Sequence, residues 1–176
     1  MPIAINGSGS ITGLTKTGIS AQPVFPGNVI QVVSYQTGAL ATGTTRIPSD
    51  DTIPQNTEGT EFMTLAITPT STTNKLLITV VLNAALSNAD NTWTVALFQD
   101  STANAIAAAA CSQTGAAYIT PVVFNHYMTA GTTLSTTFKV RSGGSIASTI
   151  TFNGSGGVRL FGGVAASSIT ITEIAA

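Results

Sequence analysis

The sequence predicts an all-β domain, and three observations lead to that prediction. Apolar residues alternate with polar or small residues at a period of two through most of the chain after Asn28. Clusters of Pro, Gly, Asn, Asp and Ser interrupt these runs at short intervals. The chain contains 30 Thr and 16 Ser among 176 residues, and β-branched Thr favours strands. Eight to ten short strands with this spacing are typical of a sandwich or a barrel.

The expected strands follow one another between residues 62 and 171. Each has a row of apolar residues that would face a core while the residues between them face outward. The rows are Met63, Leu65 and Ile67; Leu76, Ile78, Val80 and Leu82; Trp93, Val95 and Leu97; Leu134, Phe138 and Val140; Ile150 and Phe152; Ile169 and Ile171. The alanine-rich stretch 103–110 is too short for an independent helix and fits a strand equally well.

Two of the expected strands are apolar on both faces. Leu77 and Val81 lie opposite one core row, and Ala96 and Phe98 lie opposite another. A strand that is apolar on both sides is covered on both sides. Because the outer faces of a lone sandwich are wet, we expect another subunit to supply the second cover in both places.

Charge is scarce, and this scarcity excludes several classes of protein. Only 7% of residues are charged, with six Lys and Arg, one His and a net charge of −1, so nucleic acid is not an expected partner. The most apolar stretch, 76–86, is broken by Thr79 and Asn83. It is shorter than the ~20 residues that cross a bilayer, so we expect no membrane insertion. Neutral hydroxyls cost less to desolvate than charges, which favours an obligate assembly.

Residues 1–26 differ in composition from residues 27–176. They contain four Gly and three Pro, and their Ile and Leu residues are spaced too widely to form a core. We therefore expect an extended arm that lies along a partner, followed by a β-sandwich domain over 27–176; a loose leader is the alternative. The arm lacks the basic segment and apolar core of a secretory signal. The spaced Ile and Leu residues of the arm are Ile3, Ile5, Ile11, Leu14 and Ile19.

The candidates for catalysis are few. His126 is the only histidine and lies in an apolar, strand-like run over 122–128, without a G-x-S-x-G turn in the chain. We expect it to be structural. Cys111 has no partner for a disulfide and too few companions for zinc, so we expect it to pack as a small apolar residue. A single cysteine agrees with synthesis in a reducing cytoplasm.

Carboxylates and glycines give no clear site either. Asp50 and Asp51 are adjacent on a Pro-flanked loop, Asp90 lies in a turn, and Asp100 is expected to bond turn backbone at a strand end. With Glu58, Glu61 and Glu173 they leave a two-carboxylate enzyme as a remote alternative. The glycine-rich segment 154–157 is expected to be a turn, and residues 158–161 are expected to continue as a strand. Trp93 is expected to pack in the core rather than to serve as a stacking platform for a sugar ring. We predict no catalytic residue, no cofactor and no metal.

A series of segments resembles the β-rich terminal domain of fibre proteins from tailed bacteriophages and prophages. The resemblance covers about residues 28–176, and the 5–13 segment is also similar to the start of virion-surface proteins. The segments are 50–59, 67–71, 74–78, 96–105, 128–133, 138–141, 161–163 and 168–174.

This resemblance implies a homotrimer of jelly-roll-like domains on the surface of a virion, made in the host bacterium, without enzymatic activity. Two functions stay open. A surface fibre would be mounted on the tail or capsid through residues 1–26 and would contact the host surface, with glycan as the expected ligand. A capsid decoration, or cement, protein would instead clamp major capsid subunits. A fibre should present exposed aromatic residues or polar pockets at its distal end, whereas a clamp should bury its arm and base.

Overall fold

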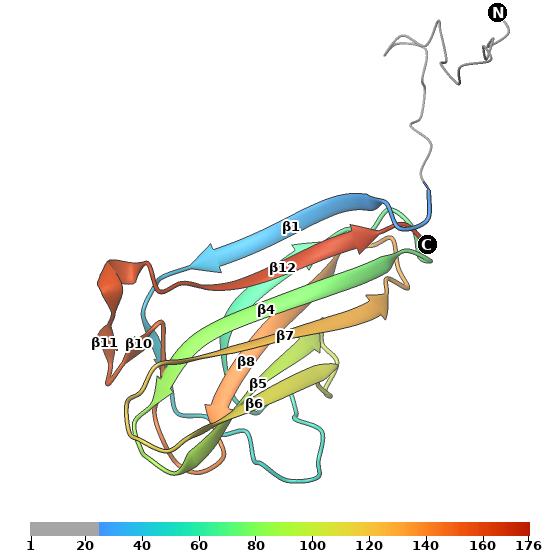
Figure 1. Cartoon of the computed structure of the whole chain (residues 1–176). Helices are drawn as coiled ribbons and strands as arrows, with labels where there is room; N and C mark the ends of the chain where they lie inside the picture. The colour runs from blue at the N-terminus through green and yellow to red at the C-terminus, as the bar shows by residue number, and fades with distance from the viewer. Residues whose placement is uncertain (1–24) are drawn as a thin grey trace, which may run out of the picture.

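The computed structural model describes residues 25–176, and the fold is an antiparallel β-sandwich with jelly-roll strand order (Figure 1). One sheet has the order β1-β12-β4 with β7 on the other side of β4, and the second has the order β3-β8-β5-β6. The prediction of an all-β, jelly-roll-like fold is confirmed. Residues 1–24 of the predicted arm lie outside the described residues.

The strands of the first sheet are β1 (Val29–Thr37), β12 (Ser167–Ile174), β4 (Lys75–Leu86) and β7 (Thr120–Thr129), with short β9 (Ile150–Phe152) and β2 (Ala41–Gly43) along the end of β4. Those of the second are β3 (Thr60–Ile67), β8 (Thr136–Gly144), β5 (Asn91–Gln99) and β6 (Ala107–Gln113). A hairpin of β10 (Gly154–Ser155) and β11 (Val158–Arg159) precedes a single 3₁₀ turn, η1 (Phe161–Gly163).

The core lies between the two sheets and uses the rows that the sequence pattern predicts. Ile78, Val80 and Leu82 of β4 face Trp93, Val95 and Leu97 of β5 across one continuous cluster of buried side chains. Cross-strand partners such as Ile78 and Ile171 share the inward face because paired residues in a sheet point to the same side. Trp93 is fully buried in this cluster, so its assignment to the core is confirmed.

One predicted core residue is wrong. Leu134 lies in the turn before β8 and is 75% exposed. The strand begins only at Thr136, because Asp100 accepts hydrogen bonds from Thr136 Oγ1 (2.9 Å) and Thr137 N (2.7 Å) and fixes the start of the pairing there. Asp100 lies at a strand end, as expected, but its carboxylate bonds a hydroxyl and a backbone N–H of β8 rather than the backbone of its own turn.

The second cover of Ala96 and Phe98 comes from the same chain, which corrects the expectation of another subunit. Ile47, fully buried, packs on both residues. The segment 44–59 that carries Ile47 is held across the outer face of the second sheet by Arg141, whose Nε and Nη2 donate to the carbonyls of Glu58 and Gly59 at 2.7 Å each. Gly59 has φ 64°, and a Cβ at this position would press on the Ile47 side chain, so glycine is needed for the cover to seat.

A buried carboxylate ties the end of the chain to the rest of the fold. Glu173 of β12 is fully buried and accepts hydrogen bonds from Gln31 Nε2 (2.6 Å), Thr70 N (2.8 Å), Thr70 Oγ1 (2.8 Å) and Asn74 Nδ2 (2.6 Å). Burial alone raises the pKa of Glu173, but these four donors outweigh it and hold the pKa below its ordinary value near 4.5. The charge is therefore stabilised by neutral donors that converge from β1 and the 70–74 loop.

Replacing this carboxylate tests its contribution to stability. Glu173→Gln puts an amide NH₂ against groups that are themselves donors, so we expect a loss of about 2–4 kcal/mol in the free energy of unfolding at pH 7. Because the folded pKa is lowered, the contribution is present above about pH 4.5 and disappears as the pH falls through the folded pKa. Urea unfolding at several pH values measures both effects. Glu61→Gln, which removes only a partly exposed 3.5 Å ion pair with Arg141, is the control, with a loss below about 1 kcal/mol. Equal stability of Glu173→Gln and wild type at pH 7 would contradict this account.

Candidate functional site

The structure places His126 and Cys111 in packing roles. His126 lies on the inward row of β7, between Phe124 and Met128, which pack against the core. Desolvation by this partial burial lowers the pKa of His126 below 6.5, so the ring is neutral at pH 7. Cys111 of β6 is half-buried against the same core. Neither side chain lies beside a carboxylate that could orient it, as far as the hydrogen bonds of residues 25–176 show.

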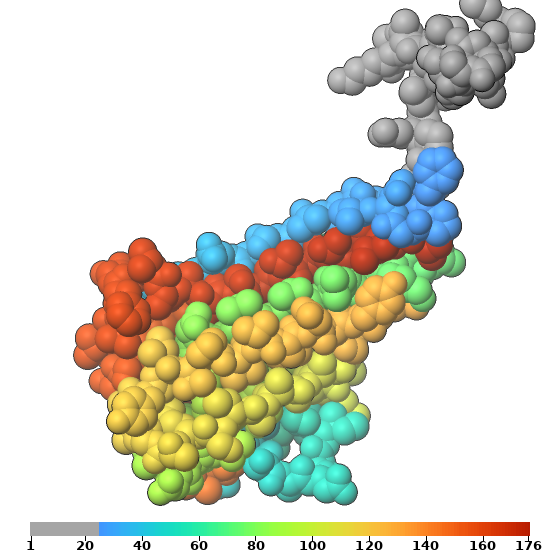
Figure 2. Space-filling view, in the orientation of Figure 1, coloured from blue at the N-terminus to red at the C-terminus, as the bar shows by residue number. Residues whose placement is uncertain are grey.

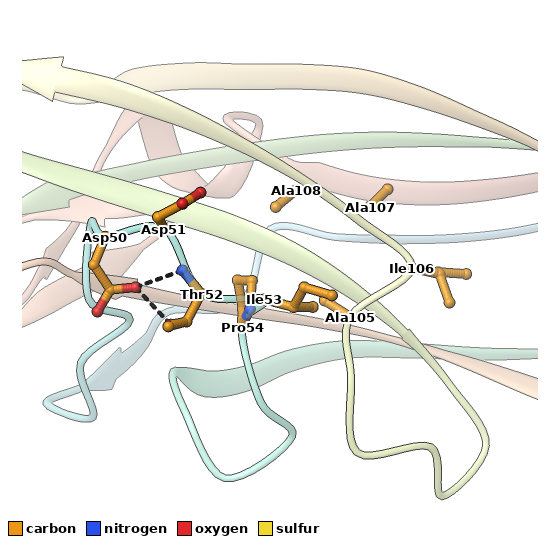
Figure 3. A pocket seen from close by; sticks show the side chains of 9 residues that line it. All are labelled: Asp50, Asp51, Thr52, Ile53, Pro54, Ala105, Ile106, Ala107 and Ala108. Atoms are coloured by element: carbon orange, nitrogen blue, oxygen red, sulfur yellow. Dashed lines mark hydrogen bonds between the residues drawn. The ribbon is translucent and has the colours of Figure 1, made fainter.

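The paired aspartates of the 50–54 loop line a shallow hollow of about 330 Å³ against the start of β6 (Figure 3). Asp50 accepts hydrogen bonds from Thr52 N (2.9 Å) and Thr52 Oγ1 (2.5 Å), and these bonds lower its pKa. Asp51 points away from Asp50 in this view. The other lining residues are mostly aliphatic, including Ile53 and Ile106. Asp50 therefore shapes its own loop, and Asp50 and Asp51 are the only ionisable side chains among the residues that line the hollow.

The remaining acids are also dispersed. Glu58 accepts from the backbone N–H of Gln55 (2.8 Å), Glu61 pairs with Arg141, and Asp90 adopts a positive φ of 51° in the exposed turn before β5. Within residues 25–176 there is no group of three or more His, Cys, Asp or Glu side chains that could hold a metal ion. The same part of the chain has no helix long and apolar enough to cross a membrane.

The glycine-rich segment 154–157 contains the predicted turn, at Gly156 and Gly157, while Gly154 and Ser155 form the short strand β10. Gly156 and Gly157 have φ of 58° and 78° between β10 and β11, the two positive values that a tight hairpin turn demands. The expected strand over 158–161 ends earlier, at Arg159. Phe161 leaves it with φ 48° and opens the 3₁₀ turn, because Gly163 N and Val164 N bond back to Leu160 O and Phe161 O at 3.0 and 3.1 Å.

This hairpin region forms an exposed apolar surface that we call the tip, made of Tyr118, Val158, Phe161 and Val164. Their exposed fractions are 67%, 63%, 70% and 83%. The two parts of the tip are joined, since Ser155 Oγ donates to Ala117 O, beside Tyr118. The tip lies at one end of the sandwich, with the β10–β11 hairpin at the left in Figure 1. Sequence reasoning missed it; the signal was an aromatic residue followed directly by two glycines, Phe161-Gly162-Gly163.

The backbone of the tip is held in an unusual conformation. Ala117 and Phe161 have φ of 61° and 48°, a region that costs residues with a side chain of the order of 1 kcal/mol or more. Gly38 supports this geometry, because a Cβ there would overlap the carbonyl oxygen of Gly163. The fold therefore fixes Phe161 in its exposed position.

The opposite end of the sandwich, which we call the base, is where the described chain begins and ends. Gly27 N donates to Ala175 O (2.9 Å), and Ala175 N donates to Asn28 O (2.9 Å). Phe25, Val29 and Leu134 are 63%, 60% and 75% exposed. The described chain therefore enters the sandwich at the base.

The chain was compared with protein families, curated sequences and solved structures. No protein-family model and no curated protein sequence matches the chain. Among solved structures, the Eiger TNF of S. frugiperda matches with 10% identity and a TM-score of 0.44, over 82% of this chain and 93% of that one. The infectious bursal disease virus Gx strain structure matches with 14% identity and a TM-score of 0.42, over 84% of this chain. The bacteriophage CBA120 tailspike protein 4 domain matches with 16% identity and a TM-score of 0.31, over 71% of this chain. This chain spans 33% of the bursal virus chain and 19% of the tailspike chain.

Substitutions at His126 and Cys111 test their assignment to packing. His126→Gln and Cys111→Ala should each cost at most about 1–3 kcal/mol and leave the oligomeric mass of the wild type unchanged, because both residues are only half-buried at the sheet edges. Thermal unfolding and light scattering measure this. Leu82→Ala, which empties a fully buried position, is the control and should cost about 2–5 kcal/mol. If the wild type had a hydrolytic activity and either variant lost it, that residue would belong to a catalytic site and the assignment to packing would be wrong.

Proposed function

We propose that the chain is a non-enzymatic structural protein of a bacteriophage virion. In this proposal it is a homotrimeric surface fibre or spike, mounted on the tail or capsid through residues 1–26, and it contacts the host surface with the tip. The resemblance of residues 28–176 to fibre terminal domains supports the virion role. The scattered carboxylates and the neutral, half-buried His126 support a role without catalysis.

The observation that carries the proposal is the polarity of the sandwich. The chain enters at the base, beside its own C-terminus, while the exposed Phe161 and Tyr118 lie at the tip. The strands between them run the length of the domain, since Val29 pairs with Ile174 at one end of β12 and Thr37 pairs with Ser167 at the other. A domain held at its base thus presents its aromatic surface outward.

The tip has the chemistry of a contact surface. Exposed aromatic side chains supply large apolar area at little cost in conformational entropy, and a Tyr hydroxyl adds a polar group. Arg159, exposed on β11, provides five donors beside this surface. Aromatic faces with nearby donors suit the ring faces and hydroxyls of a glycan, which is the ligand class we propose.

Deletion of the arm tests the mounting role. Protein lacking residues 2–22 should remain folded and soluble, because the described sandwich begins at Phe25 and buries its own core. It should no longer be incorporated into particles, since each of the five Ile and Leu residues of the arm could contribute about 1.5–3 kcal/mol when buried on a partner. Quantitative mass spectrometry of purified virions measures incorporation. Normal occupancy by the truncated protein would show that attachment runs through the β domain.

Removal of the aromatic side chain at the tip tests host contact. Phe161→Gly deletes the exposed ring and relieves the positive φ, so stability should stay within about 1 kcal/mol of wild type. Virions that carry it should adsorb to host cells at least tenfold more slowly. Leu134→Ala, which removes an equally exposed apolar side chain at the base, is the matched control and should adsorb normally. Unchanged adsorption of Phe161→Gly virions would contradict a role of the tip.

A capsid decoration protein is the second candidate, and one observation favours it. The base also carries exposed apolar side chains, Phe25, Val29 and Leu134, which a clamp would bury against capsid subunits. Electron cryo-microscopy of intact particles distinguishes the two. Density on the capsid lattice, with the base buried and an unoccupied tip, would favour the clamp; density on a tail or at a spike, with the tip outward, would favour the fibre.

A further inference from the structure

We infer that the outer face of the β1-β12-β4-β7 sheet is a subunit interface, and that its β4–β7 half is covered by another copy of this chain. This inference rests on the proposed trimer and names the surface that forms it. The outer face is defined by side chains that alternate with the core row on each strand. Figure 2 shows it, with β1, β12, β4 and β7 as adjacent blue, red, green and orange bands and no other segment across them.

The β4–β7 half of this face is apolar. Leu77 pairs with Tyr127 and Val81 pairs with Val123, so the four side chains form two cross-strand pairs on the same side of the sheet. Val123 and Tyr127 are each 58% exposed, and Leu77 and Val81 are partly exposed. Their core-side neighbours Ile78 and Val80 are fully buried, so β4 is apolar on both faces, as its sequence predicts.

The β12–β1 half is uncharged and mostly polar, apart from Val32 (55% exposed) and Ile174, and its polar groups are in part already satisfied. A row of polar side chains crosses the whole sheet between the apolar pairs, in which Thr79 Oγ1 donates to Asn125 Oδ1 (2.8 Å) and the hydroxyls of Ser34 and Thr170 share a hydrogen bond (2.9 Å). Groups that keep a partner inside the sheet cost less to remove from water. This half can therefore be covered together with the apolar half.

Charge argues for a copy of this chain as the occupant. Among the outward positions of these four strands the only charged side chain is Lys75, at the end of the face nearest the base, where its Nζ donates to Thr129 Oγ1 (2.7 Å). A face without carboxylates and with one peripheral cation has no pattern that would select a charged foreign partner, and it does not repel itself.

The size of the face is adequate for a stable interface. The ten paired residues of β4 extend about 33 Å, and four strands span about 19 Å, which gives roughly 600 Å² in projection before the relief of the side chains is counted. A standard interface buries about 800 Å² per partner. The face is thus comparable to what a specific association of copies uses.

The contrast with the other sheet supports the same occupant. The outer face of the β3-β8-β5-β6 sheet is apolar at Ala96 and Phe98, and the chain covers it with its own segment 44–59. By contrast, no segment within residues 25–176 covers Leu77 and Val81 on the outer face of the first sheet. A surface left open on every copy is covered most simply when copies meet there.

Lysine substitutions test the interface. Val123→Lys and the double variant Val123→Lys/Tyr127→Lys change exposed side chains of an edge strand, so the isolated sandwich accommodates them, while they place charges in the apolar half. Sedimentation equilibrium of the full-length chain should show a trimer for wild type and at least a hundredfold weaker association for the double variant. Ala66→Lys, exposed on the outer face of β3, is the matched control and should associate like wild type. A double variant that stays trimeric would overturn the inference.

Footprinting of the unaltered protein gives a second measurement that does not depend on how variants fold. In the wild-type oligomer, hydroxyl radicals should label Tyr127 at least fivefold less than Tyr118, although the two rings have similar exposure within one chain, 58% and 67%. Equal labelling, or a wild type that is monomeric at 10 µM, would overturn the inference. An oligomer that forms through this face but is absent from virions would refute the proposed function alone, and a virion protein whose Tyr127 is fully labelled would refute the interface alone.

Discussion

Every face of a sheet that carries apolar side chains must be removed from water, and in a chain with 7% charged residues this requirement governs the whole structure. The inner faces cover each other through the cluster around Trp93 and Leu82. The outer face of the second sheet is covered by Ile47 on the segment 44–59. The outer face of the first sheet keeps Leu77, Val81, Val123 and Tyr127 open within one chain. Scarce charge makes that opening costly, because little charged surface offsets it in solution.

Buried charged and polar groups also hold the sandwich together, because they hydrogen-bond strands to neighbouring strands and loops. Glu173 gathers four donors where β12 meets β1 and the 70–74 loop, and Gln113 exchanges hydrogen bonds with the backbone N–H and carbonyl of Leu86 (3.0 and 2.9 Å) where the two sheets join. Hydrogen bonds from neutral donors satisfy these groups without exposed counter-ions. The low charge of the sequence is therefore compatible with a well-specified sandwich.

The sequence predicted the parts of the fold that follow from local alternation, and it misjudged the parts that depend on distant segments. The rows at 76–82 and 93–97 are buried as expected, because a period of two alone decides which side of a strand is apolar. The cover of Ala96 and Phe98 could not be foreseen, since Ile47 lies about fifty residues away in a segment without periodicity. The tip was missed for a related reason. Phe161 continues an apolar run by pattern, and only its positive φ and the room left by Gly38 turn it outward.

The proposed interface and the two ends of the sandwich fit together geometrically. The outer face runs along the strands, whereas the base and the tip lie at their ends, so covering the face with copies leaves both ends free. Copies related by a threefold axis roughly along the strands would gather three bases at one end and three tips at the other. Three arms would then act on one mount, and three weak tip contacts would act on one surface, with a gain in avidity that needs no new contact. In the proposed trimer, the same face that removes Leu77 and Val81 from water would also set the three tips side by side, so that weak contacts of single tips would add up to attachment.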